Sequence, residues 1–188
     1  LNWWDRGPRH TTANKPINTP EDLIGLKIRV PEIPAMVDTW KAMGATPTPM
    51  AWSEVYTGLQ QHTIDAQENP IPFIYGGRIQ EVQTHISLTA HKYEYVTLAM
   101  SDKKFQGLSK EQQDIIVKAA KTATDYENNL VVTETEKLLN EMVEKNGLIV
   151  VKPNIEPFAE LAVKAHMPYA QSIGMEDLLN RINKELGR

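Results

Sequence analysis

Two arginines occupy positions from which a side chain can enter a ligand cleft. Arg9 follows Gly7-Pro8, a pair typical of a turn, and Arg29 lies near the carboxyl end of the apolar and basic segment 26–30. The planar guanidinium of arginine suits bidentate recognition of a carboxylate. If the two groups converge they define a site for an acidic ligand, and the alternative is two solvated surface arginines.

Aromatic, amide and imidazole side chains stand at further junctions. Trp52 lies between a predicted strand and a predicted helix, where an indole can form a pocket wall or pack in the core. Asn69 precedes Pro70, and a backbone restricted in this way can direct the amide into a cleft or simply form a loop. His10 and His91 lie near predicted loops or strand ends and could also line a site.

Motifs for catalysis and nucleotide binding are missing from the sequence. There is no phosphate loop, no dinucleotide fingerprint, no pair of histidines four residues apart and no Gly-x-Ser-x-Gly elbow. The absence of cysteine excludes disulfides, cysteine nucleophiles and thiolate zinc sites. We therefore predict no catalytic residue, no metal site and no cofactor.

Composition narrows the class of partner. The 188 residues carry a formal net charge of −4, from 20 basic and 24 acidic residues. This mildly acidic balance disfavours nucleic acid or an anionic membrane surface. No apolar run reaches the ~20 residues that a membrane-spanning helix needs. Two tryptophans within four residues of the start lead us to expect that an N-terminal piece is missing.

The elements that position these side chains alternate between strand and helix. Nine of the 12 prolines lie in residues 1–72, which predicts short elements there and longer helices later. Hydrophobic spacing predicts strands at 26–30, 46–50, 63–68, 84–89, 95–101 and 148–151, and helices at 34–43, 54–61, about 110–146, 156–172 and 175–186. The pattern predicts an α/β sheet with helices packed on its faces, in which ligands bind beyond the carboxyl ends of strands.

Four ordered stretches resemble the substrate-binding proteins of tripartite ATP-independent periplasmic (TRAP) transporters, of the DctP type. They look closest to the sugar-acid branch that includes the sialic-acid binders. The stretches are GPRHTTAN (7–14), GLKIRVP (25–31), GATPTPMAWSEVY (44–56) and DAQENP (65–70). The resemblance implies a periplasmic protein, not an enzyme, that captures an organic acid between two lobes and delivers it to membrane permease subunits.

The same resemblance divides the chain between two lobes of a periplasmic-binding-protein-like, type II-like fold. Residues 1–94 and 135–188 would form the C-terminal ligand-binding lobe, and 95–134 would contribute a strand and part of a long lobe-spanning helix to the other. The main part of that other lobe would precede Leu1. Without it, apolar faces lack partners, so we expect self-association or pairing with the missing N-terminal fragment.

The resemblance also implies roles for single residues. Arg29 would form the salt bridge with the ligand carboxylate and Arg9 would assist. The pre-proline amide of Asn69 and the indole of Trp52 would lie against the ligand. The histidine that matches His91 is close to the site in some members of the family.

Three positions depart from the family pattern. His62 and Ala66 stand where the family usually has glycine, so we expect altered turn geometry there. Glu32 replaces a small polar residue of the sialic-acid binders. A carboxylate lining the pocket favours a hydroxyl-rich ligand, so we expect a uronic or aldonic acid rather than sialic acid.

Other functions stay open as hypotheses. The main rival ligand is a C4-dicarboxylate or another small organic acid without hydroxyls. An α/β enzyme acting on a sugar acid would use Glu68 or Glu54 as a base together with a histidine. A sensor domain of related fold would have transmembrane flanks that this sequence does not show.

Overall fold

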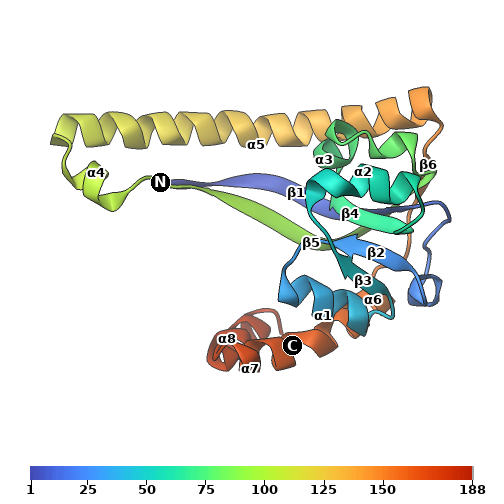
Figure 1. Cartoon of the computed structure of the whole chain (residues 1–188). Helices are drawn as coiled ribbons and strands as arrows, with labels where there is room; N and C mark the ends of the chain where they lie inside the picture. The colour runs from blue at the N-terminus through green and yellow to red at the C-terminus, as the bar shows by residue number, and fades with distance from the viewer. Residues whose placement is uncertain (188) are drawn as a thin grey trace.

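A single mixed sheet forms the centre of the molecule in the computed structural model, which describes residues 1–187. The sheet has six strands in the order β3-β2-β4-β1-β5-β6 (Figure 1). β2 is parallel to β3 and β4, β1 is antiparallel to β4 and β5, and β6 is parallel to β5. The strands are β1 (Asn2–Ala13), β2 (Lys27–Val30), β3 (Thr46–Pro49), β4 (Ala66–Pro70), β5 (His85–Leu98) and β6 (Ile149–Val151).

Helices cover both faces of this sheet (Figure 1). On one side lie α1 (Pro34–Ala42), α6 (Glu156–Ala162), η3 (Val163–Ala165), α7 (His166–Ser172) and α8 (Glu176–Glu185). On the other lie α2 (Trp52–Gln60), α3 (Ile71–Gly76) and α5 (Lys110–Asn146). Short elements complete the chain: η1 (Pro20–Leu23), η2 (Ile79–Glu81) and α4 (Asp102–Gln106).

Each face of the sheet has its own hydrophobic core. Ile28 and Val30 of β2 pack with Trp40 of α1 and Phe158 of α6. On the opposite face Val55, Leu59, Ile74, Ile86 and Met142 join α2, α3, β5 and α5. Alternate residues of a strand point to opposite faces of the sheet. A strand that is covered on both faces therefore needs apolar side chains or paired polar groups on each face. The α/β fold predicted from the sequence is confirmed.

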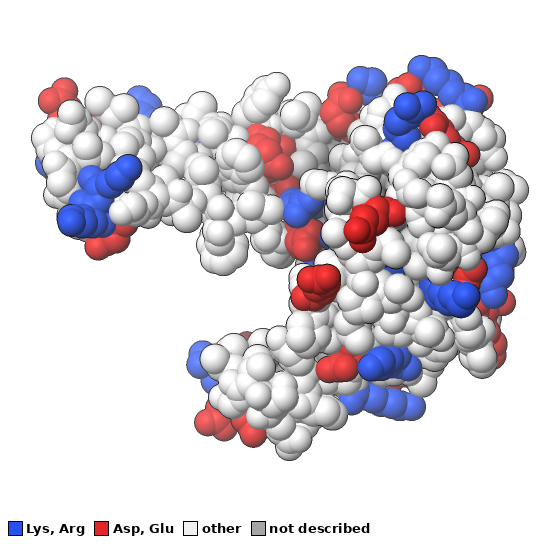
Figure 2. All heavy atoms as spheres, in the orientation of Figure 1, with Lys and Arg blue, Asp and Glu red and all other residues white. Residues whose placement is uncertain are grey.

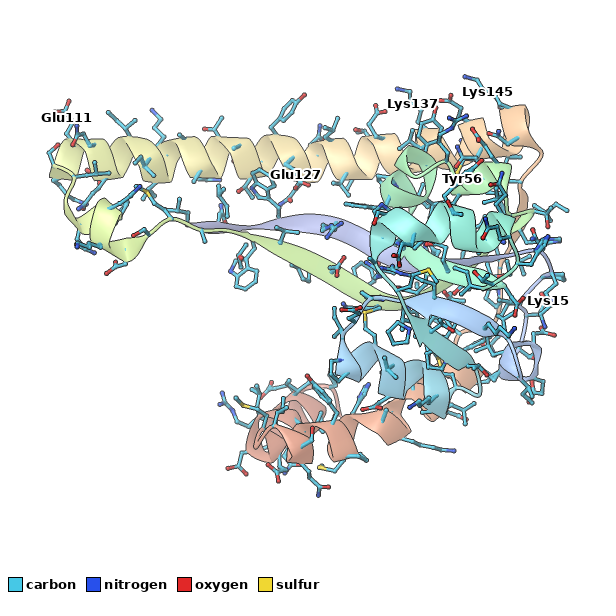
Figure 3. The ribbon with its side chains drawn as sticks, viewed as in Figure 1. Lys15, Tyr56, Glu111, Glu127, Lys137 and Lys145 are labelled. Atoms are coloured by element: carbon cyan, nitrogen blue, oxygen red, sulfur yellow. The ribbon has the colours of Figure 1, made fainter. Side chains whose placement is uncertain are left out.

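Part of the molecule projects from this body as an arm, made of residues 2–5, 95–106 and 110–132. α5 has 37 residues and is roughly 55 Å long at 1.5 Å per residue, so its first half passes beyond the sheet. Trp4 Nε1 donates to Thr124 Oγ1 at 3.0 Å, and the Asp5 amide donates to Asn128 Oδ1 at 2.8 Å. Glu127 points from α5 toward the paired strands (Figure 3), and Figure 2 shows the molecule hollowed between the arm and α7–α8.

The longest strands differ from the prediction. Gly7-Pro8 is not a turn, because Gly7 takes a φ of +72° inside β1 and the pairing with β5 shifts register between Asp5 and Pro8. The strands predicted at 84–89 and 95–101 are one strand, β5, with a second irregularity beside Ala90. Both are β-bulges, which let a strand continue through residues that favour turns.

The helical and turn predictions are closer to the structure. α5 begins with the predicted capping box, in which Ser109 and Gln112 exchange side-chain and backbone hydrogen bonds, and ends at Gly147 with φ +70°. His62 adopts a left-handed φ of 58°, as a glycine would, so that turn keeps its geometry with a less suitable residue. Ala66 lies inside β4, and the altered turn expected there was wrong.

Candidate ligand-binding site

Arg29 is a buried cation with part of its guanidinium uncommitted. It lies in β2, between Ile28 and Val30, whose side chains fill the α1 core, so its own side chain lies on the α2 face. Nε and Nη2 both donate to the carbonyl oxygen of Met50, at 2.8 and 2.7 Å. Among residues 1–187, Nη1 has no hydrogen-bond partner and the guanidinium has no ion pair. Nη1 can therefore donate to an added anion.

The electrostatics of Arg29 are compatible with that role. Burial lowers its pKa, the carboxylate of Glu68 raises it and Arg9 lowers it, with a net decrease. An arginine stays protonated at neutral pH after such a change. With 5% of its surface exposed, Arg29 presents its charge where water screens it poorly.

Trp52 forms a wall beside Arg29. It is the first residue of α2 and 37% of its surface is exposed, which is high for an indole that packs in a core. The Cζ atom of Arg29 lies 5.6 Å from the centre of the indole ring, within the range of a cation–π contact. The far edge of the ring abuts Gly77, where a Cβ atom would approach Cζ2 of Trp52 to 2.5 Å.

Arg9 is bound on several sides by acidic and amide groups. Its Nε donates to Glu68 Oε2 at 2.6 Å and its Nη2 to Glu68 Oε1 at 2.8 Å, a bidentate pair. Nη1 donates to Glu94 Oε2 at 2.7 Å, and Nη2 also reaches Asn69 Oδ1 at 2.9 Å. The Arg9 and Glu68 side chains are 5% and 0% exposed. This guanidinium is occupied far more fully than that of Arg29.

His91 completes the same cluster. Its Nε2 lies 3.0 Å from Glu68 Oε2 and its Nδ1 lies 2.8 Å from the hydroxyl of Thr89. Its ring packs edge-on against Trp40 at a centroid distance of 4.8 Å. Burial raises the pKa of Glu68, but hydrogen bonds from His91 and Arg9 outweigh burial and hold the pKa below its ordinary value. Glu68 is therefore an ionised and fully paired carboxylate.

The local charge balance favours an anion. Glu94 is shared by Arg6, Arg9 and Lys92, at 3.3, 2.7 and 3.3 Å. Arg6 also interacts with Glu127, so these three cations are matched by the carboxylates of Glu68, Glu94 and Glu127, and Arg29 adds the excess positive charge. Such an excess attracts negatively charged solutes and repels cations.

The structure brings five of the six predicted site residues into two neighbouring groups, which come from β1, β2, β4, β5 and the start of α2. Arg29 and Trp52 contact each other on the α2 face. Arg9, Asn69 and His91 meet around Glu68, where the amide of Asn69 bonds Arg9 and donates to Gln67 Oε1 at 2.9 Å. Glu32 is exposed between β2 and α1, and no hydrogen bond or ion pair links it to either group in the described part of the chain.

Sequence reasoning missed two members of this site. Glu68 was considered only as an enzymatic base, and Glu94 was not considered. A carboxylate in a strand predicted to be buried was the available signal, because buried carboxylates need a cationic partner. Among residues 1–187 the structure places no three His, Asp or Glu side chains where they could hold a metal ion. Within the same residues no helix has the length and apolar character to cross a membrane.

Several known proteins are similar to this chain in sequence. The chain is 37% identical over 174 residues to the sialic acid-binding periplasmic protein SiaP of Vibrio cholerae. The aligned region covers 93% of this chain and 54% of SiaP. It is 38% identical over 161 residues to the 2,3-diketo-L-gulonate-binding periplasmic protein YiaO of Escherichia coli, covering 85% and 49%. The chain thus spans about half the length of these curated relatives.

Solved structures and a family comparison complete the assignment. A TRAP periplasmic solute-binding protein from Sulfitobacter with bound β-D-galacturonate superposes with a TM-score of 0.89 at 34% identity, over 96% of this chain and 60% of that one. Residues 1–172 match the DctP family, described as bacterial extracellular solute-binding protein, family 7. This chain, with its buried arginines on a two-faced α/β sheet, belongs to the DctP family of solute-binding proteins.

Proposed function

We propose that this chain is the greater part of a TRAP solute-binding protein that captures a sugar acid with one carboxylate, of the uronate or aldonate type, in the periplasm. The bound acid is then delivered to the permease subunits in the membrane. Relatives named for sialic acid and diketogulonate, and a solved structure with galacturonate, support this ligand class. The single observation that carries the proposal is the buried Arg29 guanidinium, whose Nη1 has no hydrogen-bond partner within residues 1–187.

In this proposal the ligand carboxylate binds Arg29 and the sugar carbons lie on the exposed face of Trp52. A charge-assisted hydrogen bond contributes about 1.5–3 kcal/mol, so one or two to Nη1 are enough to select an acid over a neutral sugar. Arg9 assists through its charge, because Glu68 and Glu94 already occupy most of its donors. Glu32, exposed at the end of β2, would accept from ligand hydroxyls.

The ligand is enclosed, we propose, between two lobes. Residues 1–94 and 135–188 form one, and 95–134, in the arm, belong to the other. Residues 2–5 pair with 95–98, so in this proposal the start of β1 would accompany the second group. The relatives' remaining length would supply most of the second lobe, and the hollow between the arm and α7–α8 would receive it.

The competing hypotheses are less well supported. A C4-dicarboxylate needs two available cationic partners, and Glu68 and Glu94 occupy Arg9. An enzymatic base should have a pKa near the working pH, whereas the pKa of Glu68 is lowered by its partners. Glu54, the other proposed base, is exposed on α2.

A ligand titration tests the proposal. We expect D-galactonate and D-galacturonate to bind this chain, measured by NMR shift or calorimetry, and succinate to bind at least ten-fold more weakly. Arg29→Gln should weaken galactonate binding at least about 30-fold, because truncating one partner of a buried charged pair costs about 2–5 kcal/mol. Arg181→Gln, an exposed change on α8, should leave binding unchanged. Undiminished affinity in Arg29→Gln would refute the assignment.

A further inference from the structure

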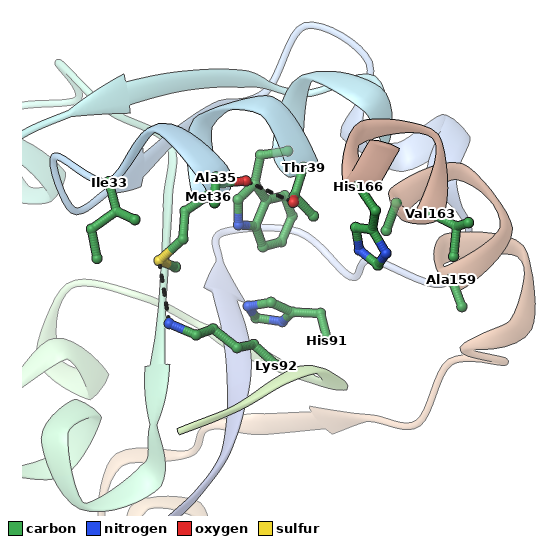
Figure 4. A pocket seen from close by; sticks show the side chains of 11 residues that line it. Ile33, Ala35, Met36, Thr39, His91, Lys92, Ala159, Val163 and His166 are labelled. Atoms are coloured by element: carbon green, nitrogen blue, oxygen red, sulfur yellow. Dashed lines mark hydrogen bonds between the residues drawn. The ribbon is translucent and has the colours of Figure 1, made fainter. Parts of the chain in front are cut away.

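A separate cavity lies on the other face of the sheet from Arg29 and Trp52. It has a volume of about 350 Å³ and lies between α1, β5 and the α6–α7 segment (Figure 4). Its apolar walls come from Ile33, Met36, Trp40, Ala159, Ala162 and Val163. This size falls within the range of cavities that hold small molecules. His91 and Lys92 belong both to this cavity and to the charged cluster around Glu68 and Glu94.

Lys92 places one cation at the edge of these apolar walls. Its Nζ lies 3.3 Å from Glu94 Oε1 and 3.8 Å from the sulfur of Met36 (Figure 4). A thioether is a weak acceptor, and Glu94 is also bound by Arg6 and Arg9. An ammonium with three donors and one shared carboxylate retains capacity for a further anion.

Three other polar side chains line the cavity, those of Thr39, His91 and His166, and the first two are bonded to identified protein groups. The hydroxyl of Thr39 donates to the carbonyl of Ala35 at 2.7 Å. Both ring nitrogens of His91 have partners, Glu68 and Thr89. A hydroxyl-rich sugar acid would leave its own hydroxyls unpaired here, which costs about 1–3 kcal/mol for each buried group. The cavity therefore suits an apolar body with one anionic end.

We propose that this cavity is a second ligand site, which takes a small amphipathic carboxylate such as a short-chain fatty acid. The carboxylate binds Lys92 and the hydrocarbon packs against Trp40, Ala162 and Val163. This site is distinct from the sugar-acid site on Arg29. It goes beyond the proposed function, because it predicts binding of an acid that has no hydroxyl groups.

Hexanoate and hexan-1-ol, which share a chain and differ in charge, are the probes. Binding is followed through the methyl NMR signals of Ala162 and Val163 in this chain. We expect saturable shifts with hexanoate and at least ten-fold weaker binding of hexan-1-ol. Lys92→Met keeps an unbranched apolar stem and should remove that ten-fold difference. Lys103→Met, on exposed α4, should preserve it.

A second variant tests where hexanoate binds and changes no residue of the hydrophobic core. Ala159 lines the cavity from an exposed position of α6, so Ala159→Leu should obstruct it and weaken both probes at least five-fold. Ala123→Leu, at an exposed position of α5, is the matched control and should change neither. Arg29→Gln should leave hexanoate binding intact, so failure here is distinguishable from failure of the sugar-acid proposal.

Three results would overturn the inference. One is the absence of saturable shifts at Ala162 and Val163 in the wild-type chain. Another is hexanoate binding to Lys92→Met as tightly as to wild type, which would exclude Lys92 as the carboxylate partner. The third is competitive displacement of hexanoate by galactonate, which would show that the two ligands share one site.

Discussion

Removal of the Arg9 guanidinium should destabilise the fold, not only weaken binding. Arg9→Met leaves Glu68 with 0% exposure and without its bidentate partner, keeping only His91. Breaking a buried pair by removal of one partner costs about 3–5 kcal/mol. With a urea m-value of about 2 kcal/mol/M, the midpoint of unfolding at pH 7 should fall by roughly 1.5–2.5 M.

The loss should depend on pH in a defined direction. In the wild type the pKa of Glu68 is lowered, so its contribution is present above the ordinary carboxyl pKa near 4.5 and is lost as pH falls through the folded value. In Arg9→Met burial dominates and raises that pKa, so the variant gains relative stability as protonation neutralises Glu68. The difference between wild type and variant should therefore shrink from pH 7 toward pH 4.

A double variant separates a stranded charge from simple loss of packing. Arg9→Met/Glu68→Leu removes both charges and should be more stable than Arg9→Met alone by at least about 1 kcal/mol. Arg181→Met on exposed α8 should stay within about 0.5 kcal/mol of wild type. The reasoning is refuted if urea unfolding, followed by circular dichroism, shows the double variant to be no more stable than the single one.

Three further changes have defined outcomes. Gly77→Ala should displace the indole of Trp52 and weaken galactonate binding several-fold. Gly76→Ala, where nothing but the adjacent residues and the backbone of its own helix lies within 4 Å of the added Cβ, should leave binding unchanged. Equal titration curves for the two variants would contradict the role of Gly77 in positioning Trp52. Burial and, to a smaller extent, the charge of His91 lower the pKa of His10 to about 4. The free energy of unfolding should therefore fall by about 3 kcal/mol between pH 6.5 and pH 4. If His10→Gln shows the same decrease in stability with pH in acid unfolding, His10 is excluded as its source. The arm exposes Tyr126 and Val132, each 70% exposed, so light scattering should detect association that Tyr126→Glu/Val132→Glu abolishes, and a clean wild-type monomer would disprove it.

The central part of the fold was predictable because its signals are local. The elements from β2 to α2 are short, and their apolar residues follow the period of a strand or a helix. Gly25 and Gly44, both with positive φ values, mark the boundaries before β2 and after α1. β1 was not predictable in this way. Gly7-Pro8 is a turn signal by itself, and pairing with β5 before and after the bulge, together with pairing to β4 from Arg9 onward, keeps it within a continuous strand.

The site was predictable as residue types but not as pairings. The guanidinium chemistry of Arg9 and Arg29 can be read from the sequence. Arg29 lies near the end of a strand as predicted, whereas Arg9, which was expected to follow a turn, lies inside β1. Which of them is occupied depends on register: Thr11 lies opposite Glu68, which places Arg9 diagonally next to that carboxylate. Residues 9, 68 and 91 come from three strands, and no local pattern specifies their alignment.

The two arginines therefore have different roles despite identical chemistry. Arg9 is held by Glu68, Glu94 and Asn69, so its charge is largely compensated and its position is fixed before a ligand arrives. Among residues 1–187 the guanidinium of Arg29 has no ion pair, and it donates to the neutral carbonyl of Met50, which orients its plane without neutralising it. A preoriented and uncompensated cation loses little entropy when it binds a carboxylate, so the stronger interaction with the ligand belongs to Arg29.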